Sequence, residues 1–126
     1  ILKALDRNGL SRRTLVVFTS DNGPEVTGEV VPGVYDRARE FGHFSQGELR
    51  GAKRDTWEGG HRVPFIVRWP GRVVPGRVST ARMCHVDLLA TLADLLRKPL
   101  PESAGEDSES VLPALLARAD EAGGRE

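Results

Sequence analysis

Two adjacent oxygen-bearing side chains, Asp21 and Asn22, are the first residues of this sequence whose types and spacing could do chemistry. They follow an apolar run at 14–19 that is rich in β-branched and aromatic residues, which predicts a strand buried on both faces. In open α/β sheets, ligands bind beyond the carboxyl ends of parallel strands. A carboxylate and a carboxamide at such a strand end suit a hard cation such as Ca²⁺ or Mg²⁺.

The same residues also fit a plain turn. Asn22-Gly23 is a common two-residue hairpin turn, and residues 25–31 would then form the returning strand. Pro24 counts mildly against this hairpin, because proline removes a hydrogen-bond donor where strand pairing would begin. The local pattern therefore leaves both the turn and the cation site open.

A second dense stretch, residues 49–64, reads LRGAKRDTWEGGHRVP and mixes glycines, cations and one large aromatic side chain. Glycine lets the backbone approach a ligand closely, and Lys53 carries a compact positive charge suited to an anionic oxygen. A glycine-rich turn with solvated charges explains the same residues, so this alternative also stays open.

The other candidates favour simpler interpretations. His43, in a long irregular loop at 25–52, is more often a solvated side chain than a pocket residue. His85 and Asp87 are more often a packed histidine and a helix cap than a catalytic pair. Cys84, the sole cysteine, is expected to be a small buried apolar side chain.

The elements that would position these residues alternate between helix and strand. Helices are expected at 1–8, near 35–40, at 85–97 and at 111–119, and strands at 14–19 and 65–69. Gly9 would end the first helix, and leucines at helical spacing give the helix at 85–97 one apolar face. The alternation favours an α/β fold with a parallel sheet.

Composition restricts the class of protein. The chain has 126 residues, enough for one small domain, with 18 Lys and Arg against 18 Asp and Glu. This balance, with few aromatic residues, argues against a nucleic-acid surface, and no apolar run is long enough for a membrane span. No export signal is visible, and the opening without Met suggests part of a longer protein.

Taken together, the stretches TSDNGP at 19–24, LRGAK at 49–53, TWEGGHRVPFIVRWPG at 56–71 and HVDLLATL at 85–92 resemble the type I sulfatases. These are arylsulfatase-like hydrolases of the alkaline phosphatase superfamily. The resemblance covers roughly residues 1–112. It implies an α/β fold, part of an alkaline-phosphatase-like mixed, mostly parallel sheet flanked by helices. Residues 1–121 would form a partial sulfatase domain and residues 122–126 a tail.

The resemblance also implies roles for individual residues. Asp21 and Asn22 correspond to two metal ligands that hold Ca²⁺, sometimes assigned as Mg²⁺. Lys53 corresponds to the catalytic lysine that contacts the sulfate group and helps the leaving oxygen. Glu58 and Arg62 belong to the motif as supporting residues. Asn22 favours a sulfatase over a two-zinc phosphodiesterase, because a carboxamide oxygen suits Ca²⁺ whereas imidazole suits zinc.

The family's nucleophile is a formylglycine made from cysteine or serine in a Cys/Ser-x-Pro/Ala-x-Arg motif, and Cys84 lacks that context. The residue is therefore expected upstream of this chain, and the chain alone is predicted to be inactive. The expected substrate is a sulfated small molecule or sulfated sugar. The alternatives are a phosphomonoester, phosphodiester or phosphonate hydrolase of the same superfamily, or an inactive truncated binding module. This chain leaves the compartment open, although periplasmic, lysosomal or secreted location is usual in the family.

Overall fold

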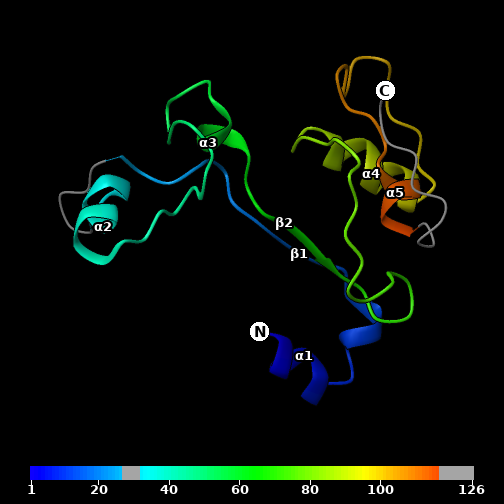
Figure 1. Cartoon of the computed structure of the whole chain (residues 1–126). Helices are drawn as coiled ribbons and strands as arrows, with labels where there is room; N and C mark the ends of the chain where they lie inside the picture. The colour runs from blue at the N-terminus through cyan, green and yellow to red at the C-terminus, as the bar shows by residue number, and fades with distance from the viewer. Residues whose placement is uncertain (27–31, 117–126) are drawn as a thin grey trace. The chain divides into compact units, whose positions relative to one another are not determined.

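The structure is a computed structural model that describes residues 1–26 and 32–116. The chain divides into two compact units, one formed by residues 1–16 and 67–126 and the other by residues 17–66. Figure 1 shows the helices and strands of both units. No helix among the described residues is long and apolar enough to cross a membrane. The predicted tail at 122–126 lies outside the described residues.

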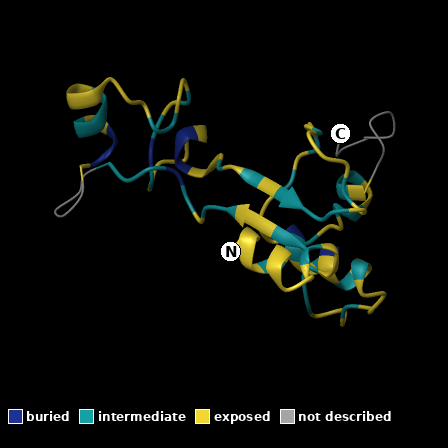
Figure 2. Ribbon diagram, turned by 90° about the horizontal axis from the view of Figure 1, so that it is seen from below, coloured by how far each residue is buried: buried dark blue, intermediate teal, exposed yellow. Residues whose placement is uncertain are grey.

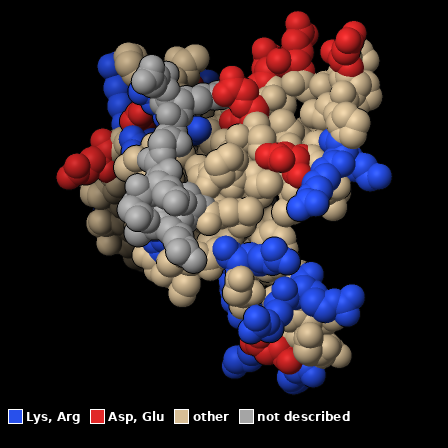
Figure 3. Space-filling model, turned by 90° about the vertical axis from the view of Figure 1, so that its right-hand side faces the viewer, with Lys and Arg blue, Asp and Glu red and all other residues tan. Residues whose placement is uncertain are grey.

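The N-terminal part of the first unit holds helix α1 (Leu2–Arg7) and the 3-10 turn η1 (Ser11–Arg13). Gly9 adopts a left-handed backbone with φ of 65°, which confirms the predicted glycine at the end of this helix. Figure 3 shows Lys and Arg side chains gathered at the lower end of the view, where α1 and η1 lie.

Strands β1 (Val16–Thr19) and β2 (Phe65–Arg68) pair in a two-stranded sheet. At one end, Trp69 Nε1 donates to the carbonyl of Arg12 (3.3 Å), and at the other, Gly23 N–H donates to the carbonyl of Gly60 (2.7 Å). The strands therefore run in opposite directions, as Figure 1 shows.

The expected double burial and parallel pairing of this first strand are wrong for the part of the chain that the structure describes. Phe18 is 63% exposed and Val17 is 36% exposed. Within the described residues β1 has one neighbour in its sheet, the antiparallel β2, so its other edge has no paired strand there. Because β1 pairs with β2, Asn22-Gly23 does not join two paired strands of a hairpin in this described region, although residues 27–31 lie outside it.

The unit of residues 17–66 contains helix α2 (Val34–Phe41) and the short helix α3 (Glu58–His61). Helix α2 confirms the helix expected near 35–40. Its first turn is closed by Asp36, whose carboxylate accepts the Gly33 N–H at 3.1 Å. Buried residues are few in the described chain (Figure 2). The buried apolar side chains among them are Val34 and Ala52.

Helices α4 (Asp87–Leu95) and α5 (Leu112–Leu116) belong to the other unit and confirm the two C-terminal helices expected. The apolar face of α4 is largely open, because Leu89, Leu92 and Leu96 are exposed. The buried side of the helix carries Asp87 and Thr91 instead.

Three predictions at the start of α4 are wrong. Val86 occupies the position before the helix and no side chain caps it, because Asp87 is already the first helical residue. The Asp87 carboxylate instead accepts the backbone N–H of Cys84 at 2.8 Å and of Glu109 at 3.0 Å. Cys84 and His85, which were expected to be buried and packed, are exposed in the segment before the helix.

Candidate functional site

The corner after β1 presents the two predicted metal ligands. Asp21 is exposed and Asn22 is half-buried, whereas Gly23 is buried. The Asn22 amide nitrogen donates to the Gly23 carbonyl at 2.8 Å, and Ser20 Oγ donates to the Asn22 carbonyl at 2.9 Å. The Asn22 amide nitrogen is used in this bond, and the amide oxygen has no partner among the described residues. The Asp21 carboxylate has no partner among them either.

Glycines bring this corner into direct backbone contact with the segment 50–62. Gly23 N–H donates to the Gly60 carbonyl at 2.7 Å. A Cβ on Gly23 would lie 1.9 Å from the Gly59 carbonyl oxygen, and a Cβ on Gly59 would lie 2.1 Å from the Gly51 oxygen. Side chains cannot fit at these distances, so Gly23 is required for the two loops to meet and Gly59 for the segment 50–62 to fold back on itself.

The turn that precedes α3 is held by its own side chains. Asp55 accepts the Ala52 N–H at 2.9 Å, and the Asp55 N–H returns a bond of 2.9 Å to the Ala52 carbonyl. The Arg50 guanidinium lies 3.7 Å from the centroid of the Trp57 ring, a cation–π distance. The Gly59 N–H donates to the Arg50 carbonyl at 2.8 Å, so this turn and α3 form one connected loop.

Lys53 lies on this loop and is joined to the corner through the two residues that follow Gly23. Its backbone N–H donates to the Pro24 carbonyl at 2.9 Å. Its ammonium lies 3.5 Å from Glu25 Oε2, and its side chain is 37% exposed. The structure thus brings the segment of Lys53 against the segment of Asp21 and Asn22, while the ammonium itself pairs with Glu25.

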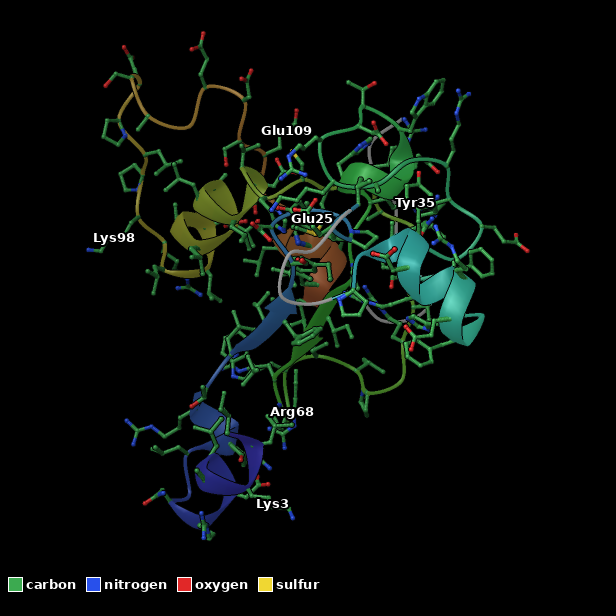
Figure 4. All side chains as sticks on the ribbon, turned by 90° about the vertical axis from the view of Figure 1, so that its left-hand side faces the viewer. Lys3, Glu25, Tyr35, Arg68, Lys98 and Glu109 are labelled. Carbon is green, nitrogen blue, oxygen red and sulfur yellow. The ribbon has the colours of Figure 1, made fainter. Side chains whose placement is uncertain are left out.

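Glu25 is a site residue that the sequence interpretation missed. Arg54 binds both of its carboxylate oxygens, with nitrogen–oxygen distances of 2.5 and 3.2 Å. The hydrogen bonds from Arg54, above all, lower the pKa of Glu25 from 4.5 to about 2, against a partial burial that raises it. The sequence offered one indication of this role: an acidic residue, Glu25, stands close after the Asp-Asn-Gly corner, and two consecutive cations, Lys53 and Arg54, stand in the second stretch. Figure 4 labels Glu25 at this position.

The predicted metal fits these residues only in part. Carboxylate and carboxamide oxygens are the donors that Ca²⁺ prefers, and both predicted ligands are uncommitted within the described chain. Ca²⁺ takes about six to eight oxygen ligands, so Asp21 and Asn22 would supply a share of such a site. The residues that the structure describes contain no group of three or more His, Cys, Asp or Glu that could hold a metal ion.

All three histidines are exposed. His43 and His61 are exposed on the unit of residues 17–66, and His85 is exposed on the other unit. The exposure of His43 agrees with the interpretation of a solvated loop histidine.

The chain matches a known family in sequence. A family model described as Sulfatase matches residues 1–98, which include β1, the Asp-Asn-Gly corner, the loop of Lys53, β2 and α4. The chain belongs to the sulfatase family, whose members are sulfuric ester hydrolases.

Individual relatives agree with this assignment. The chain is 41% identical over 118 residues to an N-acetylgalactosamine-6-O-sulfatase of Bacteroides thetaiotaomicron, covering 94% of the chain and 22% of that protein. It is 43% identical over 115 residues to the steryl-sulfatase of Mus musculus, covering 91% of the chain and 18% of that protein. The chain therefore spans about a fifth of the length of the curated relatives it matches.

A solved structure confirms the predicted fold class. It comes from a study of how Bacteroides thetaiotaomicron metabolises multiple glycosaminoglycans, and it superposes with a TM-score of 0.83 at 41% identity. The match covers 99% of this chain and 25% of the solved chain. The fold is thus part of an alkaline-phosphatase-like α/β domain.

Proposed function

We propose that the protein containing this chain hydrolyses a sulfate monoester, and that this chain supplies one side of the site that receives the sulfate group. The observation that carries the proposal is the contact between the two loops. Backbone bonds from Gly23 to Gly60 and from Lys53 to Pro24 hold the segment of Lys53 against the segment of Asp21 and Asn22, and this contact supports the proposal. A positively charged, preorganised site of this kind stabilises the negative charge that develops as an ester S–O bond breaks.

In this proposal Asp21 and Asn22 hold Ca²⁺ together with ligands from outside this chain. When bound, the ion would add positive charge beside the sulfate oxygens. Lys53 binds the same sulfate group through its ammonium, which has three N–H donors and so can keep one toward Glu25 while offering others to an anion. A formylglycine outside this chain would supply the nucleophile, as the resemblance to the family implies.

The names of the relatives favour a sulfated sugar as the substrate class. One of them is an N-acetylgalactosamine-6-O-sulfatase that aligns with 94% of this chain at 41% identity. The steryl-sulfatase is as similar in sequence, so a sterol or aryl sulfate is the comparison that an assay has to include.

The test is sulfate release by the full-length protein that contains this chain. We expect turnover of N-acetylgalactosamine 6-sulfate or 4-nitrophenyl sulfate, and much slower turnover of 4-nitrophenyl phosphate. Lys53→Ala is expected to lower kcat/KM by roughly 10²- to 10³-fold, the usual cost of losing one transition-state donor. Lys98→Ala, which removes an exposed lysine after α4, is the matched control and should leave activity unchanged. Faster hydrolysis of the phosphate ester, or full activity in Lys53→Ala, would contradict the proposal.

Two further measurements address the metal and the chain by itself. Asp21→Ala should weaken Ca²⁺ binding measured by titration calorimetry, by about tenfold or more, because a charged ligand is lost. The 126-residue chain alone should show no turnover of an aryl sulfate above its Lys53→Ala variant. Undiminished Ca²⁺ affinity in the first case, or turnover in the second, would count against the corresponding part of the proposal.

A further inference from the structure

Glu25 joins two consecutive cations on the facing loop. Its carboxylate lies 3.5 Å from the Lys53 ammonium and receives both terminal nitrogens of Arg54, at 2.5 and 3.2 Å. The Glu25 side chain is 33% exposed and that of Lys53 is 37% exposed, so the contact is at the edge of solvent. The three residues form a defined cluster, called here the Glu25 cluster.

The position of the Glu25 carboxylate is fixed independently of Lys53. The Glu25 carbonyl accepts the Val34 N–H at 2.7 Å, and one carboxylate oxygen accepts the Val26 N–H at 2.9 Å. Arg54 has a left-handed backbone with φ of 78°, which residues other than glycine rarely adopt without compensating contacts. The Glu25 carboxylate is thus held by its own loop and by Arg54, and these contacts do not depend on Lys53.

The two cations are held unequally. Arg54 makes a forked, two-bond contact, whereas the Lys53 contact of 3.5 Å is longer than the roughly 2.7–2.9 Å of a strong charged hydrogen bond. An arginine fork fixes the carboxylate geometrically, and a looser lysine stays able to turn toward an anion. The unequal contacts therefore suit a carboxylate that orients the Lys53 ammonium and still leaves it able to bind an anion.

We propose that Glu25 is a positioning residue for Lys53. It holds the ammonium beside its own carboxylate, on the segment that follows the Asp-Asn-Gly corner, and Arg54 fixes that carboxylate. This inference rests on the proposed function, because it assigns Glu25 to the sulfate-binding role of Lys53. Glu25 acts through Lys53 and not through the substrate.

A double-mutant cycle in the full-length protein tests this. Glu25→Gln preserves shape and removes the charge, and we expect it to lower kcat/KM for an aryl or sugar sulfate by about 10- to 100-fold, the cost of a misplaced catalytic group. In a Lys53→Ala background the same change should cost less than about twofold, because its target is gone. Equal losses in both backgrounds would show a general structural role and overturn the proposal, as would no loss in either.

Two variants guard against an uninformative result. Glu25→Asp keeps the charge but withdraws it by one methylene, so it should show an intermediate loss and remains usable if Glu25→Gln does not fold. Asp6→Asn removes a carboxylate that pairs with Arg68 at 3.6 Å on the other unit, and it should leave kcat/KM unchanged. A loss in Asp6→Asn as large as in Glu25→Gln would contradict a specific role for Glu25.

A measurement without substrate separates this inference from the proposed function. Acetic anhydride labels accessible amines, and mass spectrometry gives the rate at Lys53 relative to Lys98. We expect Glu25→Gln to raise the relative rate at Lys53 by at least about twofold, because its ammonium loses its ionic partner. An unchanged rate would overturn the positioning role even in an active sulfatase. A raised rate in a protein that hydrolyses no sulfate ester would leave the Glu25–Lys53 contact standing and refute the proposed function alone.

Discussion

The loop pair of residues 20–25 and 50–62 and the segment around helix α4 are held together in opposite ways. In the loop pair, backbone meets backbone at glycines, with no room for a Cβ at Gly23, Gly59 or Gly60. Around α4, one fully buried carboxylate holds the flanking loops, because Asp87 accepts the N–H groups of Cys84 and Glu109. Thr91 extends this contact, since its hydroxyl accepts the Val111 N–H at 3.0 Å.

The difference shows how a small chain can hold candidate site residues in place without a large hydrophobic core. Contact between backbones leaves the two loops little freedom to move, so the loop pair fixes the backbone positions of Asp21 and Lys53. A carboxylate that collects N–H groups fixes the path of a loop but leaves the apolar face of α4 open, with Leu92 43% exposed. The first arrangement thus fixes the backbone of the candidate residues, whereas the second fixes the loops that flank α4 in the other unit.

The largest expected effect comes from adding one methyl group to the loop pair. Gly23→Ala would place a Cβ 1.9 Å from the Gly59 oxygen, so we expect a loss of about 3 kcal/mol or more in the free energy of unfolding of the full-length protein. Urea denaturation measures this loss. Gly42→Ala is the control, because Gly42 has nothing within 4 Å of a Cβ; unlike Gly23 it has a left-handed backbone, with φ of 62°, so it should still cost about 1 kcal/mol. Similar losses in both variants would show that the close contact is not what makes glycine necessary.

The second effect tests the carboxylate at α4. Asp87→Ala leaves the N–H groups of Cys84 and Glu109 without their acceptor in a buried place, at about 1–3 kcal/mol for each unsatisfied group. Asp94→Ala on the same helix removes an exposed carboxylate that accepts the Ser110 hydroxyl, and it should cost less than about 1 kcal/mol. Thermal unfolding of both variants gives the comparison, and an Asp87→Ala loss no larger than that of Asp94→Ala would refute the role of the buried carboxylate.

The smallest effect concerns pH and sharpens the contrast between ionic and backbone contacts. The pKa of Glu25 is lowered to about 2 in the folded chain from an ordinary 4.5. A lowered pKa means that the stabilisation is complete above pH 4.5 and is lost as the pH falls toward 2. The stability difference between wild type and Glu25→Gln should therefore be constant from about pH 8 to pH 5 and shrink below that. A difference that changed between about pH 8 and pH 6 would contradict this assignment.

Local pattern was enough to predict most elements. The leucine spacing predicted α4, and Gly9 was correctly expected at the end of α1. Burial was harder to predict from the sequence. Phe18 and Cys84 were expected to be buried and are exposed, because burial depends on what packs against a residue and not on its type alone.

The sequence by itself determined the family and the candidate residues Asp21, Asn22 and Lys53, because motif residues stand in fixed order along the chain. Only the tertiary structure decided that Glu25 meets Lys53 and Arg54, whose contact with Glu25 spans 29 positions of sequence. Only the structure, too, showed why Gly23 must be a glycine. Both depend on which loops fold against each other, and no local spacing encodes the distance between two loops.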